Sequence, residues 1–526
     1  MTDRSRAAAF AACLLFTTAA LHAAPPADTD AYVAKAMSVF GAPGLSLAIV
    51  EDGHTVVARG YGVRNIMTKA PVDEHTAFPI GSESKAFTSA ALGILVDRGK
   101  LKWTDRVIDR LPGFQMYDPY VTEHMTVRDL LTHRSGLRLG QGDLLIVPTT
   151  NRTRADIVHA LRYLKPATGF REQYAYDNVL YIVAGALVES VSGQTWEDFV
   201  RQNIFVPLNM KDSLTNDDPA APNTVALHAR LDGPMRGLGT LVKLKHGLDM
   251  RVPAPAGGIS LSAVDMASWM AMFLNHGKLS NGKQLLSEDT LKMLWTPVSV
   301  TRAESFPGPM ALANPHLAAY ALGWSVEDYR GHPIIEHTGG VLGALSALYL
   351  VPDKNLGIAV SINSEDTGAR RAVLFHLLDE YLGLPQADWN GIIQTTLKQM
   401  IDQALEALKH LPPDMQPNDH ASLPIADYAG IYSDPWYGTV TVADRGHGKL
   451  WITFDRTPGM EGELEHVAND TFRTRFTDRG IEDAYMTFEV ANGRVAKAAM
   501  RPVSPLADFS FDYADLDFSP AVAKSH

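Results

Sequence analysis

Hydrophobic residues along the chain follow strand and helix patterns that together predict one large α/β unit. Apolar runs at strand spacing occupy residues 44–50 and 55–61 around a turn at 51–53, and strand-like runs return between 321 and 362. Strands at both ends of a unit with helices between them predict an antiparallel sheet that carries an inserted helical region. The expected helices lie at 127–131, 155–164, 180–192 and 263–274, and the late strands form two hairpins at 321–326 with 333–336 and 344–351 with 356–362.

Beyond residue 385 the pattern changes twice. Apolar residues at helical spacing predict a helix over 389–411, which Pro412 and Pro413 end. After a linker-like stretch, short β runs separated by turns are typical of a small all-β barrel or sandwich. These runs lie at 431–432, 438–442, 450–454, 471–476, 485–490, 495–500 and 509–513. The expected division is a main domain over 28–385, a linker over 386–420 and a β domain over 421–520.

Composition excludes some classes of partner. The 526-residue chain is 46% hydrophobic and 20% charged, an ordinary globular balance that is long enough for two or three domains. Its formal net charge of −12 argues against a nucleic-acid partner. No metal-ligand set or cofactor-binding motif stands out, so no cofactor is expected.

The first 23 residues have the pattern of a secretory signal peptide. Arg4 and Arg6 precede an apolar stretch over 7–20, and cleavage is expected after Ala23 or Ala24. A retained membrane anchor is the alternative, although the stretch is alanine-rich and short for a span. The only cysteine of the chain leaves with this segment, so no disulfide is expected. The sequence therefore predicts a periplasmic or secreted protein without a membrane span after cleavage.

The stretch 79–88 reads as a loop that turns into a helix. Ser82 lies at its mouth and Lys85 three residues later, so both side chains would share one helical face. A hydroxyl beside an amine at a helix N-terminus suits acyl transfer, because the amine eases alkoxide formation and free backbone N–H groups can bind an oxyanion. A second Ser-x-x-Lys match at 280–283 lies in a glycine-rich turn, where we expect only a surface loop.

A tyrosine and an asparagine precede the helix expected at 180–192. Asn178 is a candidate cap for that helix, which is its structural interpretation. In the catalytic interpretation, Tyr176 acts as a phenolate base if nearby cations lower its pKa.

A third candidate segment follows a predicted strand near the end of the main domain. His337 and Thr338 lead into Gly339 and Gly340, small residues that would let a substrate chain lie along a sheet edge. A plain strand-to-turn exit with a solvated histidine is the alternative. The chain has no Gly-x-Ser-x-Gly elbow in a loop, no phosphate-binding glycine motif and no His-Glu-x-x-His.

Taken together, the three segments resemble the serine β-lactamase and penicillin-binding-protein superfamily. Ser-x-x-Lys, Tyr-x-Asn and His-Thr-Gly occur in that superfamily's order and rough spacing, and the match is closest to its class C and D,D-peptidase branch. Residues 130–137 resemble its Leu-Leu-Thr-His-x-Ser-Gly-Leu stretch, and residues 255–258 its Pro-Ala-Gly-Gly turn. The resemblance covers about 31–384 and implies a β-lactamase-like α/β fold, with a helical subdomain. The tail is similar to the lipocalin-like domain of many such hydrolases.

The resemblance implies a role for each candidate residue. Ser82 would be the acylated nucleophile, and Lys85 would assist its deprotonation and hold the phenol of Tyr176 acidic. Tyr176 would be the general base, and Asn178 would orient Lys85 and the substrate amide. The third segment would line the substrate site through His337, Thr338 and Gly339. The N–H groups of Ser82 and Gly340 would form the oxyanion hole.

Two residues depart from the common pattern of β-lactamases. Position 337 is a histidine where many have lysine, and an imidazole clamps a carboxylate less firmly than an ammonium. Glu83 suits a helix N-terminus but would also raise the pKa of Lys85 if it lay beside the amine.

The expected function is therefore an exported serine hydrolase that acts on a small peptide, amide or ester. The first choice is a D,D-peptidase-like peptidase or amidohydrolase, and a carboxylesterase or a class C-like β-lactamase is the alternative. A non-catalytic sensor that binds penicillin or muropeptides is the alternative from another class. The β domain is expected to cap the mouth of the site or to build a homo-oligomer.

Overall fold

The computed structural model describes residues 24–216, 221–245, 249–410, 412, 415 and 420–521. The predicted signal peptide over 1–23 lies outside these residues. Within the described ranges, no helix combines the length and the apolar character that crossing a bilayer requires.

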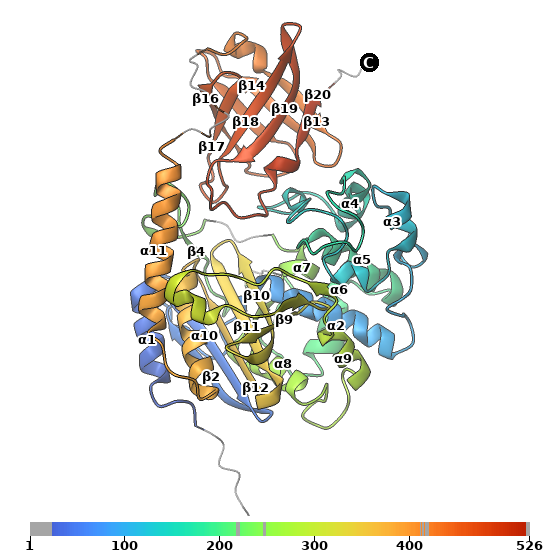
Figure 1. Ribbon diagram of the computed structural model, residues 1–526. Helices are drawn as coiled ribbons and strands as arrows, with labels where there is room; N and C mark the ends of the chain where they lie inside the picture. Colours follow the sequence, from blue (N-terminus) through green and yellow to red (C-terminus); the bar gives the residue numbers. More distant parts are fainter. Residues whose placement is uncertain are drawn as a thin grey trace, which may run out of the picture.

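An antiparallel sheet of eight strands forms the centre of the larger domain, in the order β2-β1-β12-β11-β10-β9-β8-β7 (Figure 1). Its first and last strands along the chain lie side by side, with Leu45 of β1 opposite Ile362 of β12. The predicted sheet from both chain ends is therefore confirmed. The strands are β1 (Gly44–Glu51), β2 (His54–Gly62), β7 (Ser299–Val300), β8 (Ala318–Tyr320), β9 (Ser325–Tyr329), β10 (His332–Val341), β11 (Ala344–Val351) and β12 (Leu356–Ile362).

Helices cover both faces of this sheet, so its central strands are buried on both sides. Leu45, Leu47 and Ile49 of β1 belong to the core that includes residues of α1 (Thr29–Phe40), α10 (Thr367–Tyr381) and α11 (Trp389–Ala407). Ala48 and Val50 point to the other face, where α8 (Ala263–Leu274) packs. Alternate side chains of the apolar strand β1 thus pack into two different hydrophobic cores.

The inserted helical region surrounds α2 (Ser84–Asp97), the helix that follows Ser82. Every residue of α2 from Ser84 to Leu95 is buried. The cause is tertiary, because α2 passes between neighbours on all sides. The other helices of this region are α3 (Pro119–His124), α4 (Arg154–Ala160), α5 (Val179–Ser192), α6 (Trp196–Val200), α7 (Ala254–Gly257) and α9 (Glu288–Trp295).

The strand predicted over 321–326 is wrong in its bounds. Residues 321–324 form a turn between β8 and β9, closed by a hydrogen bond from the Ala321 N–H to the Trp324 carbonyl. Gly323 adopts φ +82°, a conformation that interrupts a strand.

The pairing of β10 changes along its length. Its register with β9 ends where Glu336 lies opposite Ser325, whereas its register with β11 continues to Val341. The segment from His337 to Val341 therefore has a strand neighbour on one side, and β10 contacts the 3-10 turn (Gly81–Glu83) that precedes α2 on the other. Gly339 is required there, because a Cβ at this position would lie 1.8 Å from the Ile80 carbonyl oxygen.

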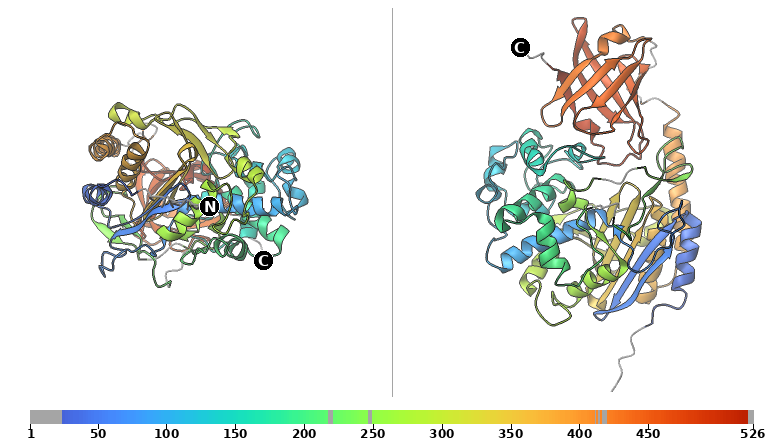
Figure 2. Two further views of the ribbon diagram at one scale, coloured as in Figure 1. Left: turned by 90° about the horizontal axis from the view of Figure 1, so that it is seen from below. Right: turned by 180° about the vertical axis from the view of Figure 1, so that it is seen from behind.

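The C-terminal domain is a closed barrel of eight strands, in which β13 pairs with both β14 and β20. Figure 2 shows it stacked on one end of the larger domain, with α11 leading up to it. The strands are β13 (Gly430–Asp434), β14 (Gly438–Asp444), β15 (Leu450–Phe454), β16 (Glu461–Ala468), β17 (Thr471–Phe476), β18 (Ala484–Ala491), β19 (Arg494–Pro502) and β20 (Asp517–Pro520).

Three strand assignments in the barrel differ from the sequence prediction. The last strand, β20, was not predicted. β16 was not predicted, because the charged residues Glu461, Glu463 and Glu465 alternate with its inward positions. The strand predicted over 509–513 is wrong, since these residues form an irregular segment that reaches the larger domain.

The close contact at Gly339 generates a stability prediction. Gly339→Ala should lower the free energy of unfolding by about 1–3 kcal/mol or more, because the new methyl group must displace backbone. Gly430→Ala is the matched control, since its Cβ would meet only ordinary contacts at 3.7 Å. Denaturant unfolding of both variants measures the difference, and equal stability would contradict the packing described here.

Candidate active site

Ser82 lies in a single turn of 3-10 helix (Gly81–Glu83) that runs directly into α2. The Lys85 Nζ lies 3.0 Å from the Ser82 Oγ. The two side chains thus share a face, as their spacing predicts.

Lys85 is fully buried and has two further oxygen partners. Its Nζ lies 2.7 Å from the Asn178 Oδ1 and 2.9 Å from the Ala256 carbonyl oxygen. Burial lowers the pKa of Lys85 to about 7, against the opposing effect of Asp143 and Asp177. A neutral amine can donate to the two oxygens, which only accept, and turn its lone pair to the Ser82 hydroxyl.

The turn at 255–258 holds this carbonyl in place. Thr88 of α2 donates to the Pro255 carbonyl at 2.7 Å, and the Ile259 N–H donates to the Ser84 Oγ at 3.0 Å. The sequence drew attention to the Pro-Ala-Gly-Gly stretch, but not to the contact between Ala256 and Lys85.

Tyr176 lies in the loop before α5, and its ring packs on His133 at 4.3 Å between centroids. The same histidine accepts the Asp177 N–H at 3.1 Å through Nδ1, which fixes the loop. Burial raises the pKa of Tyr176 well above its usual range, although a hydrogen bond with Ser82 acts in the opposite direction. The expectation that Lys85 holds this phenol acidic is therefore wrong for the resting protein, because desolvation raises the pKa of Tyr176.

Asn178 occupies the N-cap position of α5, but its side chain makes no capping hydrogen bond. Instead, its Oδ1 accepts from Lys85, and its Nδ2 donates to the Asp143 Oδ2 at 2.7 Å. Asn178 therefore connects the amine to a buried carboxyl group that the sequence did not single out.

His337 is buried beside Tyr320. Its Nδ1 lies 2.6 Å from the Thr338 carbonyl oxygen and its Nε2 lies 3.0 Å from the Tyr320 hydroxyl. Because a carbonyl only accepts, Nδ1 carries the proton and Nε2 accepts from the phenol. Burial and the nearby Lys85 lower the pKa of His337 to about 3, so the imidazole is neutral.

The residues of β10 that follow His337 point either into the cleft or into the interior of the domain. Thr338 and Gly340 line the cleft, whereas Gly339 points away from it against Ile80. Gly339 therefore supports the backbone, and its assignment to substrate binding is corrected. A Cβ on Gly81 would lie 2.6 Å from the Gly340 nitrogen, which places this amide at the mouth of the Ser82 turn.

Glu83 lies buried on the far side of the Ser82 turn. Desolvation raises the pKa of Glu83 to about 8, against a hydrogen bond with Ser346 and the charge of Arg370. The carboxyl group is therefore protonated at neutral pH. The carboxyl groups that act on Lys85 are those of Asp143 and Asp177, so Glu83 does not raise its pKa.

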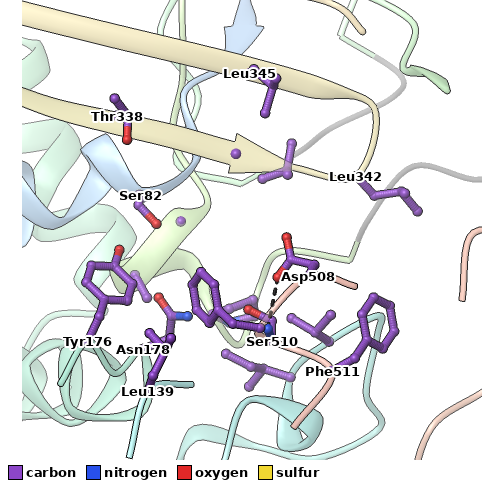
Figure 3. Close-up of a pocket in the computed structure, with 18 of the residues that line it drawn as sticks. Ser82, Leu139, Tyr176, Asn178, Thr338, Leu342, Leu345, Asp508, Ser510 and Phe511 are labelled. Atoms are coloured by element: carbon purple, nitrogen blue, oxygen red, sulfur yellow. Dashed lines mark hydrogen bonds between the residues drawn. The ribbon is translucent and has the colours of Figure 1, made fainter. Parts of the chain in front are cut away.

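A cleft of about 770 Å³ opens over Ser82, and both domains line it (Figure 3). Ser82, Tyr176 and Asn178 face this space, with Thr338 and Leu345 across from them. The barrel contributes the opposite rim through Leu506, Asp508, Phe509, Ser510 and Phe511. Of the two roles expected for the β domain, the structure shows the first, a cap at the mouth of the site.

Comparison with known proteins identifies the family of this chain. The profile of the beta-lactamase family matches residues 29–383, and that of a domain of unknown function (DUF3471) matches 415–520. The chain belongs to the beta-lactamase family. It is similar to the unguisins hydrolase ungD of Aspergillus violaceofuscus, with 28% identity over 85% of this chain and 82% of that protein. It is also 28% identical to penicillin-binding protein 4 of Amycolatopsis lactamdurans, over 65% of this chain and 85% of that protein.

Solved structures share the fold of both domains. The octameric penicillin-binding protein homologue from Pyrococcus abyssi superposes with a TM-score of 0.57 at 21% identity, covering 90% of this chain and 97% of that one. SurE superposes with a TM-score of 0.54 at 22% identity, covering 94% of this chain and 99% of that one.

The setting of His337 generates a prediction about its charge. Because burial disfavours the imidazolium, the His337 signals in ¹⁵N NMR should not titrate between about pH 5 and 8. His75 is exposed and its pKa is raised by Asp212, so its signals should titrate and serve as the control. Assignment follows from the signals lost in His337→Gln, and titration of His337 in this range would contradict the neutral imidazole.

Proposed function

We propose that this protein is a serine hydrolase that forms an acyl-enzyme on Ser82. The observation that carries the proposal is the Lys85 amine, whose pKa is about 7 and whose Nζ lies 3.0 Å from the Ser82 Oγ. At neutral pH a large fraction of this amine is free base, and it can remove the serine proton directly.

Acylation follows from the groups around the serine. Lys85 takes the proton of Ser82 as Oγ attacks the substrate carbonyl carbon. The negative charge moves to the carbonyl oxygen, where the N–H groups of Ser82 and Gly340 bind it. Tyr176, which is protonated at rest, gives its proton to the leaving group and regains one from the Lys85 ammonium.

Deacylation uses the same relay in reverse. Water attacks the acyl carbon and loses a proton to Tyr176, which passes its own proton to Lys85. Lys85 returns that proton to Ser82 Oγ as the ester bond breaks, and the acid product leaves. Tyr176 is thus a relay whose direction depends on the protonation of Lys85, whereas the resemblance implied a general base with an acidic phenol.

The substrate class that we favour is a peptide or amide without a carboxylate near the scissile bond. Among the described residues that line the cleft, the cationic side chain is Arg236, and it pairs with Glu365. The neutral His337 supplies no charge in its place. This supports a peptidase or amidohydrolase over a class C-like β-lactamase, and the relative named unguisins hydrolase agrees with hydrolysis. An esterase is the second candidate, since the leaving group of an ester does not need a stronger acid than Tyr176 to protonate it.

We further propose that the protein is exported, on the basis of the signal-like segment over 1–23. A homo-oligomer is also proposed for testing by light scattering, because a neighbour of similar fold is octameric.

Labelling by a fluorophosphonate tests the proposal. Intact mass spectrometry should show one adduct, which Ser82→Ala should lack, as phosphorus bonds to Oγ and fluoride leaves. The labelling rate should fall as pH drops through about 7, because protonated Lys85 cannot accept the serine proton. No adduct, or an adduct that persists in Ser82→Ala, would identify a non-catalytic binder instead.

A substrate panel then distinguishes the classes of activity. D-residue peptides, L-residue peptides, short esters and a chromogenic cephalosporin are compared by kcat/KM. Faster turnover of the cephalosporin than of every uncharged peptide would overturn the substrate preference while leaving the Ser82 mechanism intact.

Replacement of the phenol tests the relay. Tyr176→Phe should lower kcat on the best panel substrate by about 10²–10⁴-fold, because Tyr176 is the proposed donor of the proton to the leaving group. Circular dichroism and the thermal midpoint should stay near those of the parent protein, since the ring remains packed on His133. Near-normal turnover would exclude Tyr176 from proton transfer.

A further inference from the structure

The barrel reaches the catalytic site through the irregular segment 506–512. Asp512 of this segment accepts two hydrogen bonds from the larger domain, from the Gly142 N–H at 2.6 Å and the Leu144 N–H at 3.0 Å. These two amides flank Asp143 in a short 3-10 turn (Asp143–Leu145). The carboxylate of one domain thus holds the turn of the other.

Ser510 touches the residue in the middle of that turn. Its Oγ donates to the Asp143 Oδ2 at 2.8 Å, and the same oxygen accepts the Asn178 Nδ2 at 2.7 Å. Asn178 in turn accepts from Lys85 at 2.7 Å. Figure 3 shows Ser510 on the Asn178 side of the pocket. A chain of hydrogen bonds therefore runs from the barrel to the catalytic amine.

We propose that Ser510 and Asp512 of the barrel are positioning residues for Lys85, acting through Asp143 and Asn178. The inference rests on the proposed function and extends it, because it makes the active site a product of two domains. Neither residue touches the reacting atoms.

The physical requirement is the orientation of the Asn178 amide. Lys85 needs an acceptor at 2.7 Å, so the amide oxygen must face the amine and Nδ2 must face an acceptor on the other side. Asp143 Oδ2 is that acceptor, and Ser510 and Asp512 fix where it lies. A rotated amide would point a donor at Lys85 and remove one of the two oxygens that direct its lone pair.

The segment also seals this region from water. Phe509 packs edge-on against the Tyr176 ring at 5.8 Å between centroids, and a Cβ on Gly140 would lie 2.7 Å from the Phe509 carbonyl oxygen. Asp143 is fully buried beneath it. Removal of the segment would therefore expose the carboxyl group that faces the catalytic asparagine.

The charges around this chain determine the pH response. Burial, together with the nearby Asp512, raises the pKa of Asp143 well above its usual range, whereas the Asn178 and Ser510 hydrogen bonds lower it. Because ionised Asp143 raises the pKa of Lys85, a higher pKa of Asp143 favours the free amine. The other titratable groups that face Lys85 are Asp177, His133, His337, Tyr176 and Tyr181.

The test follows the fluorophosphonate labelling rate of the full chain against pH. Ser510→Ala should slow labelling about three- to tenfold, the effect of losing one hydrogen bond that orients the amide. Ser510→Thr keeps the hydroxyl and should restore most of the rate. Ser519→Ala, on an exposed position of β20, is the matched control and should label like the parent protein.

A second variant separates positioning from a loss of fold. Burial raises the pKa of Asp512 itself to about 7, so its carboxyl group is ionised above that pH. Asp512→Asn removes this charge, lowers the pKa of Asp143 and so raises that of Lys85, which should move the acid limb of the labelling rate to higher pH. Ser510→Ala should move that limb to lower pH, because loss of its hydrogen bond raises the pKa of Asp143. Rates are normalised to folded protein by circular dichroism. A general loosening of the structure would not produce shifts in opposite directions.

The outcomes are distinct. Slower labelling by Ser510→Ala, rescue by threonine and opposite shifts of the limb support the inference. Parent-like rates and an unchanged limb in both variants, with a labelled parent protein, overturn it alone. A parent protein without a Ser82 adduct overturns the proposed function and this inference with it.

Discussion

The burial of a single amine is the constraint on which the rest of this site depends. A lysine without access to water keeps its proton poorly, and the pKa of Lys85 falls to about 7 for this reason. Burial of an amine is unfavourable unless its hydrogen bonds are satisfied. The Asn178 oxygen and the Ala256 carbonyl meet that need, and they leave the lone pair for the Ser82 hydroxyl.

The surrounding architecture can be understood as a means of excluding water from this amine. Helix α2 passes through the middle of the domain, so the first residues after Ser82 are covered on every side. The unpaired side of β10 closes against the Ser82 turn, and Gly339 allows this because it has no side chain. On the remaining side the barrel supplies Phe509, Ser510 and Asp512. Residues of both domains thus contribute to the desolvation of the Lys85 amine.

Desolvation also explains the unexpected protonation states. Glu83, Tyr176 and His337 are all neutral at pH 7, because each lies where a charge would lose its hydration. Sequence patterns assign charge by residue type, and they predicted an acidic phenol and left the charge of the imidazole open. A site with these neutral groups differs from one that clamps a carboxylate with a lysine.

The sequence determined the features that depend on neighbours along the chain. The spacing of Ser82 and Lys85, the β1–β2 and β11–β12 hairpins and the switch to a β domain near residue 420 all follow from local periodicity. The order of the three motifs was sufficient for the family. Periodicity did not reveal β16, because the glutamates on its outward side make the strand look polar although the residues between them are buried.

Only the tertiary structure decided what lies around the amine. Asp143, Ser510 and Asp512 carry no motif, and Ser510 is 367 positions from Asp143 along the chain. Residues 509–513 even have the composition of a strand, but the side chains of Ser510 and Asp512 bind the other domain, and the backbone makes local turns. The sequence therefore determines the spacing of Ser82 and Lys85, whereas the pKa of Lys85 is a property of the fold. Desolvation depends on all the neighbours of the amine, and no local pattern brings these together.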